Sequence, residues 1–175
     1  MTAHLLTVGH GTATEEELTR LLGDAGARRL VDVRRYPGSR VHPYTRREAL
    51  ERSMPAAGVA YRWDERLGGR RRGSAEPLDC WWRVPAFRAY AEHMRSDEFV
   101  AGIDDLVADI QTAPTVIMCS ESLWWRCHRR LIADYLVLVR AIAVCHLDHR
   151  GILTDHRVAA GARVSSSNVL VYDLP

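Results

Sequence analysis

Residues 115–146, with the sequence TVIMCSESLWWRCHRRLIADYLVLVRAIAVCH, decide the fold class of this chain. Thr115–Met118 and Ala141–His146 are short apolar runs of the kind that form buried strands. Between them, apolar residues recur at helical spacing over about residues 126–140, which predicts an amphipathic helix. A strand, a helix and a strand joined by short connections predict two parallel strands with a helix packed against them.

The same alternation extends toward the N-terminus, where three more apolar runs predict strands. These runs are Leu5–Val8, Leu30–Arg34 and Val59–Trp63. Five such strands separated by helical segments are typical of an α/β protein. We therefore predict one α/β domain with a mostly parallel sheet of about five strands and helices on both faces, a Rossmann-like three-layer arrangement.

Helix starts can be placed from capping residues. Thr14 with Glu17, and Thr45 with Glu48, each have the spacing of a capping box, in which two side chains satisfy the first free backbone amides. Pro85 fits the first turn of a third helix, and Ser96 is a typical N-cap for a fourth. Residues 64–83 form a long loop, which is usually functional rather than a simple connection.

The boundaries of the domain are predicted from where the alternation stops. Residues 1–150 are expected to form the α/β domain, and residues 151–175 a C-terminal extension with one late strand at Val169–Tyr172. No apolar stretch approaches the length of about 20 residues that spans a membrane. The first six residues do not resemble a secretion signal, so we expect a cytoplasmic protein.

The charge balance and the absence of lysine exclude several classes of function. The chain has 175 residues with 24 basic and 22 acidic side chains, a net charge of +2, and every basic residue other than histidine is an arginine. Such a balance argues against a protein that coats nucleic acid. Without lysine, the chain cannot form a Schiff base, and it must bind any anion through arginine, histidine or backbone amides.

Polar residues follow each predicted strand. Because the carboxyl ends of parallel strands meet at one edge of the sheet, where ligands bind in such folds, these residues are expected to lie together. Cys119 follows the fourth strand and is the candidate nucleophile, since a thiol near a helix start and arginines is stabilised as the thiolate. His10 and His128 are the candidate acid/base groups and Glu121 a proton acceptor, while Arg34 and Arg129 are expected to clamp an anion.

Two alternatives use overlapping residues. Cys119, Cys127 and His128 are metal-ligand types, so the cluster could hold an ion, although its spacing matches no standard zinc module. The run Arg70–Arg72 together with tryptophans 81, 82, 124 and 125 could contact nucleic acid, although core packing also explains the tryptophans. The sequence does not identify a cofactor.

A set of short motifs, taken together, resembles the domain-of-unknown-function family numbered 488. The motifs are Gly9-His10, Asp32-Val33-Arg34 with Pro37 and Ser39, Leu67-Gly68-Gly69, Phe87 with Tyr90 and Met94, Cys119 with Glu121, Cys127-His128-Arg129, and His146. The resemblance covers residues 7–148. It implies that His10, Arg34, Cys119, Glu121, His128 and Arg129 are signature positions, and it adds Ser39, Gly69 and Tyr90 as substrate-binding candidates. Gly11 departs from the family pattern, which usually has serine there.

These features together predict an enzyme that acts on a small anionic molecule or nucleotide by thiol-based or acid/base chemistry. The metal-dependent enzyme and the nucleic-acid-binding module remain the alternatives. The resemblance supplies no substrate.

Overall fold

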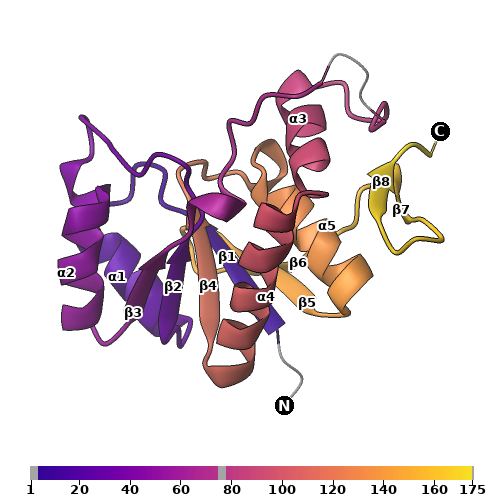
Figure 1. Ribbon diagram of the computed structural model, residues 1–175. Coiled ribbons are helices and arrows are strands. Elements are labelled where there is room, and N and C mark those ends of the chain that lie inside the picture. Colours follow the sequence, from indigo (N-terminus) through magenta and orange to yellow (C-terminus); the bar gives the residue numbers. More distant parts are fainter. Residues whose placement is uncertain (1–3, 75–77, 175) are drawn as a thin grey trace.

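A computed structural model describes residues 4–74 and 78–174 and has an α/β architecture (Figure 1). Five parallel strands come from the runs predicted above. They are β1 (His4–Gly9), β2 (Arg29–Asp32), β3 (Ala60–Trp63), β4 (Thr115–Cys119) and β5 (Ala143–Leu147). A sixth strand, β6 (Leu153–Asp155), pairs antiparallel with β5, so that the sheet has the order β3-β2-β4-β1-β5-β6. The predicted fold class is confirmed.

Helices cover both faces of the sheet (Figure 1). They are α1 (Glu15–Asp24), α2 (Arg47–Ala56), α3 (Pro85–His93), α4 (Asp97–Thr112) and α5 (Arg129–Arg140). Alternate strand residues enter two cores: Val116 and Met118 pack with α1 and α2, whereas Ile117 and Cys119 pack with α3, α4 and α5. Because every central strand is buried on both faces, the strands read as continuous apolar runs in the sequence.

Three of the helix starts behave as predicted. Pro85 is the first residue of α3. Thr14 and Glu17 form both hydrogen bonds of the capping box at α1, and the Ser96 hydroxyl accepts from the Phe99 amide at α4. The second capping box was a wrong prediction. Thr45 ends the 3-10 turn η1 (Pro43–Thr45) and lies one residue before Arg46, the N-cap of α2, which makes no side-chain capping hydrogen bond.

The helix predicted from about residue 126 begins later, at Arg129, because residues 124–126 form the 3-10 turn η3 (Trp124–Arg126). After α5, Ala141 adopts a left-handed conformation (φ 53°) that ends the helix, so β5 starts at Ala143. The remaining 3-10 turn, η2 (Glu65–Leu67), interrupts the long loop after β3.

Residues after 150 add β6 to the sheet and then form a separate hairpin beside α5. The late strand β8 (Leu170–Tyr172) pairs with β7 (Ala162–Val164) rather than with the main sheet (Figure 1). The division of the chain at residue 150 stays a prediction. Among the described residues, no helix has the length and apolar character needed to cross a membrane.

The strand order determines where a ligand can enter. β4 lies between β2 and β1, whose following helices pack on one face, while the chain leaves β4 toward α5 on the opposite face. Connections that diverge to opposite faces leave a crevice at the carboxyl ends of the strands, the usual ligand site in such sheets. Cys119, the last residue of β4, lies at this crevice.

Candidate functional site

A cavity of about 220 Å³, here called the thiol pocket, opens at this crevice. It collects residues from five separate segments of the chain, and its charged lining residues are four arginines, one glutamate and one titratable histidine. The lining consists of Arg34, Arg35, Tyr36, Gly69, Arg70, Ala86, Phe87, Tyr90, Cys119, Ser120, Glu121, Arg126, Cys127 and His128. The excess of arginine makes the pocket suited to an anion.

Six of the nine predicted site residues line the thiol pocket: Cys119, His128, Glu121, Arg34, Tyr90 and Gly69. His10, Arg129 and Ser39 do not line it. Ser39 instead accepts a hydrogen bond from the His42 amide and so supports the turn before α2.

Cys119 and Cys127 form the centre of the pocket. Their Sγ atoms lie 2.7 Å apart, although seven residues separate them in the sequence, and both residues are buried. Cys119 comes from the end of β4, and Cys127 comes two residues before the start of α5. The backbone folds back here because the loop between them packs on Gly9, where a Cβ atom would overlap with the Glu121 carbonyl oxygen.

The two thiols share their protons unequally. Burial and the hydrogen bond with Cys127 raise the pKa of Cys119 well above its ordinary value. Burial opposes ionisation of Cys127 as well, but the hydrogen bond from Cys119 and the neighbouring His128 and Arg129 outweigh it and lower the pKa of Cys127. The start of α5 adds the positive end of a helix dipole. Cys127 is therefore the more acidic thiol of the pair, and Cys119 donates its S–H to it.

Arg129 is almost completely buried and has its donors engaged inside the protein. Its Nε donates to Cys119 Sγ (3.0 Å), Nη1 to the Thr7 hydroxyl (3.1 Å) and Nη2 to the Glu121 carbonyl (2.5 Å). The role of anion clamp predicted for this residue is therefore not what its geometry favours. Arg129 is instead the countercharge of the sulfur pair, because a buried thiolate needs a nearby cation.

His128 lies on the other side of Cys127. Its Nε2 donates to the Val33 carbonyl (3.0 Å), which leaves Nδ1 directed at Cys127 Sγ at 3.4 Å. Gly69 approaches this ring closely, since a Cβ there would lie 3.0 Å from Nδ1. His128 is thus oriented to exchange a proton with the Cys127 sulfur.

Arg34 and His10 belong to a second network, anchored on Asp32. Arg34 binds both carboxylate oxygens of Asp32 (2.8 and 2.6 Å) and also donates to His10 Nε2 (3.2 Å). His10 donates from Nδ1 to the Gly11 carbonyl, so both ring nitrogens are occupied. Burial and the Arg34 charge lower the pKa of His10 to about 4, so the ring is neutral at pH 7.

Two further predicted residues have structural partners. The Tyr90 hydroxyl donates to the Leu67 carbonyl (2.6 Å), so only its ring faces the pocket. The Glu121 carboxylate accepts from the Leu123 amide through one oxygen. Glu121 therefore keeps a second carboxylate oxygen for a proton or a ligand.

Behind Arg129 lies a buried chain of polar groups that the sequence analysis did not identify as a unit. The Thr7 hydroxyl contacts His146 Nδ1 (2.7 Å), His146 Nε2 contacts His156 Nδ1 (2.9 Å), and His156 Nε2 contacts Asp134 (2.8 Å). Burial, His156 and Arg129 lower the pKa of His146 to about 3. The signal that could have found the chain is Asp134, a charged residue inside the apolar face of α5.

The two alternative functions gain no geometric support. Within residues 4–74 and 78–174, no three His, Cys, Asp or Glu side chains are grouped so that they could hold a metal ion. For nucleic acid, Arg71 binds the carbonyls of Glu65, Arg66 and Gly68 rather than facing solvent. Trp82 is buried, and Trp124 stacks on His146 at 4.0 Å between ring centroids.

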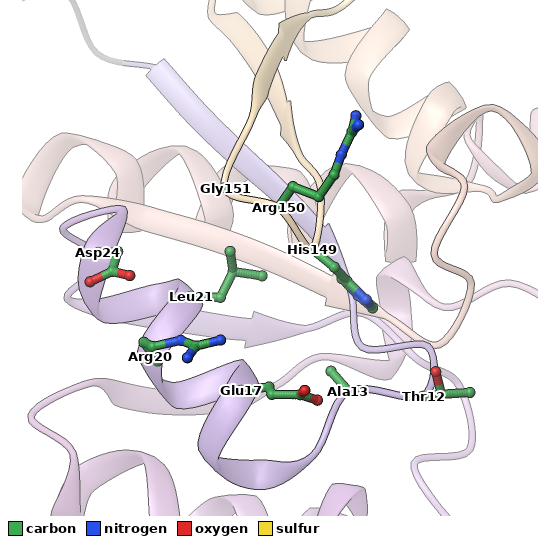
Figure 2. A pocket seen from close by; sticks show the side chains of 9 residues that line it. All are labelled: Thr12, Ala13, Glu17, Arg20, Leu21, Asp24, His149, Arg150 and Gly151. Carbon is green, nitrogen blue, oxygen red and sulfur yellow. The ribbon is translucent and has the colours of Figure 1, made fainter.

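A second cavity, of about 450 Å³, lies beside α1 and contains none of the predicted site residues. Residues of α1 line one side, and the loop after β5 lines the other (Figure 2). Its charged groups are of both signs, with Glu17 and Asp24 near Arg20 and Arg150, and the Glu17 carboxylate caps α1. Mixed charge and a structural carboxylate make this cavity a weaker candidate than the thiol pocket.

Comparison with known proteins identifies one family. A family model described as domain of unknown function DUF488 matches residues 14–136. No curated protein and no solved structure matches the chain at a significant level.

Proposed function

The chain belongs to the DUF488 family, and for this member we propose a thiol-dependent transferase or hydrolase that acts on a small anionic molecule. The observation that carries the proposal is the sulfur pair in an arginine-lined pocket, with its thiolate on Cys127. A low pKa is the condition under which a thiol is a nucleophile at neutral pH.

In the proposed reaction, the Cys127 thiolate forms a bond with an electrophilic atom of the substrate. The leaving group departs with the electrons of the broken bond and takes a proton from solvent or from a neighbouring acid. Water or a second acceptor then removes the substrate group from the sulfur and restores the thiolate. Cys119, the nucleophile expected from the sequence, has the supporting role of donating its S–H to Cys127.

The other pocket residues have roles that follow from their contacts. Arg35, Arg70 and Arg126 supply positive charge at the pocket wall, and the Asp32-bound Arg34 adds a fixed guanidinium. His128 exchanges a proton with the sulfur, and Arg129 holds the negative charge in place. His10 positions Arg34 rather than acting as an acid or base, because both of its nitrogens are occupied.

Alkylation of the cysteines tests the proposal without knowledge of the substrate. At about pH 6, well below the ordinary thiol pKa of about 8.5, Cys127 should react with iodoacetate faster than the exposed Cys80 in the same chain. The ratio of iodoacetate to iodoacetamide rates should also be higher at Cys127, because the arginines attract the anionic reagent. Peptide mass mapping identifies the modified cysteine.

Two variants sharpen this measurement. Cys127→Ser should abolish the fast reaction, and Arg129→Gln should move its midpoint to higher pH, because removal of the cation raises the pKa of the thiol. Arg140→Gln is the matched control at the far end of α5, where the arginine pairs with Asp104 on the surface. Equal rates at Cys127 and Cys80, or the same midpoint in both arginine variants, would contradict the proposal.

A further inference from the structure

A larger groove continues from the thiol pocket across the molecule. It has a volume of about 1040 Å³ and shares Ala86, Phe87 and Arg126 with the pocket. Its walls come from residues 80–84, α3, η3, α5 and the end of the chain after β8. A molecule that reaches the sulfur pair through this side therefore lies along the groove, which we call the aromatic groove.

One wall of the aromatic groove consists of stacked and edge-on rings. Trp82 packs against Trp81 at 4.7 Å and against Phe87 at 4.9 Å between centroids, so these rings are held in place. Trp125 is different, because 48% of it is exposed to solvent. An exposed indole beside an apolar wall is a surface on which a planar ring can stack.

The charge of the groove is positive. Arg83, Arg126 and Arg130 line it, and none of the three forms an ion pair within the described part of the chain. The acidic lining residue, Asp173, is already paired with Arg163 at 2.6 Å. Three free guanidinium groups beside aromatic rings favour an occupant that carries both a negative charge and a planar ring.

Two buried donors in the wall also point to a missing acceptor. Trp82 Nε1 and Arg130 Nε are buried, and neither has a hydrogen-bond partner among residues 4–74 and 78–174. Arg130 lies over the Trp82 ring at 4.9 Å, so the two residues form one unit in the lining. A buried donor without an acceptor costs free energy, so this part of the wall carries unused hydrogen-bonding capacity.

We propose that the aromatic groove binds a substrate with the chemistry of a mononucleotide, through the planar ring and the charged group of that substrate. The reactive end of the same substrate enters the thiol pocket. The reactive end rests on the proposed function, whereas binding in the groove does not. A mononucleotide fits better than a strand of nucleic acid, because the thiol pocket is small and Arg71 is occupied by backbone carbonyls.

Titration calorimetry with four probes tests the proposal on the full chain. Two probes are mononucleotides, adenosine 5′-monophosphate and uridine 5′-monophosphate. The other two are fragments of a mononucleotide: ribose 5-phosphate, which lacks the base, and adenosine, which lacks the phosphate. At least one mononucleotide should bind about tenfold or more tighter than ribose 5-phosphate and adenosine, because only it uses both stacking and charge. Mononucleotide affinities no better than those of the two fragments would overturn the proposal.

Variants locate the ring and the charge. Trp125→Ala should weaken the mononucleotide about tenfold and leave ribose 5-phosphate unchanged, whereas Trp125→Phe should retain most of the affinity. Leu153→Ala is the control, because this leucine on β6 is equally exposed but lies outside the groove. A similar loss in the Leu153→Ala variant would overturn the assignment to Trp125.

Arg126→Gln should weaken all phosphate-bearing probes. Arg150→Gln, which removes an arginine from the second cavity, should not. If Arg150→Gln weakens binding and Arg126→Gln does not, the ligand lies beside α1 and the proposal is overturned. The proposal is also overturned if a short single-stranded oligonucleotide binds tenfold tighter than the mononucleotides.

A last measurement separates this inference from the proposed function. The bound mononucleotide should protect Cys127 from iodoacetate, because the groove and the pocket share Arg126. If a mononucleotide binds but Cys127 does not react rapidly with iodoacetate, the binding proposal stands and the proposed thiol function is contradicted. If Cys127 reacts rapidly but no mononucleotide binds, the thiol function stands and the binding proposal is contradicted.

Discussion

At the scale of single residues, the site depends on a charge that is largely shielded from water. Cys127 lines the thiol pocket but is only 6% exposed, and Cys119 is 1% exposed, so a thiolate here must be stabilised mainly by protein groups. The S–H of Cys119 and the ring of His128 lie 2.7 Å and 3.4 Å from the sulfur of Cys127, and the guanidinium of Arg129 donates to the adjoining sulfur of Cys119. Each of these groups is therefore expected to change the reactivity of Cys127 when it is replaced.

The distance between the two sulfurs leads to a prediction about oxidation. A disulfide needs an S–S distance of about 2.05 Å, and the Sγ atoms are already 2.7 Å apart. Diamide, which accepts two hydrogens from two thiols, should therefore join Cys119 and Cys127 faster than it joins any pair with Cys80 or Cys145. Intact mass and non-reducing peptide maps measure the product.

The controls are variants of the same four cysteines. A Cys80→Ser/Cys145→Ser protein should still form the disulfide rapidly, and Cys119→Ser should not. If the Cys80→Ser/Cys145→Ser protein keeps both remaining thiols reduced under these conditions, the two sulfurs are not in contact in solution.

At the scale of elements, the ends of β1 and β4 hold the site together. The His10 amide donates to the Cys119 carbonyl, and the Gly11 amide donates to the Ser120 carbonyl, so the two strand-end loops continue the sheet pairing. This pairing requires glycine at position 9, because the Glu121 carbonyl occupies the space of a side chain. Local sequence around Gly9 thus determines the position of the cysteine loop 110 residues away.

Two glycine substitutions test this argument with opposite expected signs. Gly9→Ala should lower the free energy of unfolding by roughly 1–3 kcal/mol, because the new methyl group overlaps with backbone that cannot move freely. Gly23→Ala, in α1 with open space around it, should raise that free energy by about 0.5–1 kcal/mol. Urea denaturation measures both. An equal effect of the two substitutions would show that the strand-end loops do not approach as closely as described.

At the scale of the whole molecule, buried histidines link stability to pH. Burial, with Arg34 for His10 and His156 for His146, lowers the pKa of the two rings from 6.5 to about 4 and about 3. The folded protein therefore keeps both rings neutral in a range where the unfolded chain protonates them. Since the unfolded state binds more protons there, stability rises with pH in that range.

We expect the free energy of unfolding to fall as the pH falls from about 6.5 toward 4. Asp64 and other carboxyls with lowered pKa values take up protons only at lower pH, so they do not contribute to this change. Urea midpoints measured between these pH values should fall steadily in the wild type and fall less in His146→Gln. His4→Gln, at an exposed position at the start of β1, is the matched control. A wild-type midpoint that does not change over this range would contradict the prediction.

The five parallel strands, most of the helices and the sheet edge of the candidate site could be predicted from the sequence alone. Apolar runs, the Thr14–Glu17 capping box and Ser96 act through neighbours a few residues away, so they can be interpreted without a structure. The failed capping box at Thr45 shows the limit of this reasoning, because the loop before α2 forms the 3-10 turn η1 and places Arg46 rather than Thr45 at the N-cap.

The contacts among the predicted site residues and the shifts of their pKa values follow from the tertiary structure and not from the sequence. The contact of Cys119 with Cys127, the enclosure of Arg129 and the buried chain from Thr7 to Asp134 each join distant segments. A pKa depends on burial and on the charges within a few ångströms, and neither quantity can be determined from spacing along the chain. For this reason the sequence predicted a thiol site at Cys119, whereas the structure brings Cys127 into contact with it, lowers the pKa of Cys127 and places an aromatic groove lined by three arginines beside the pair.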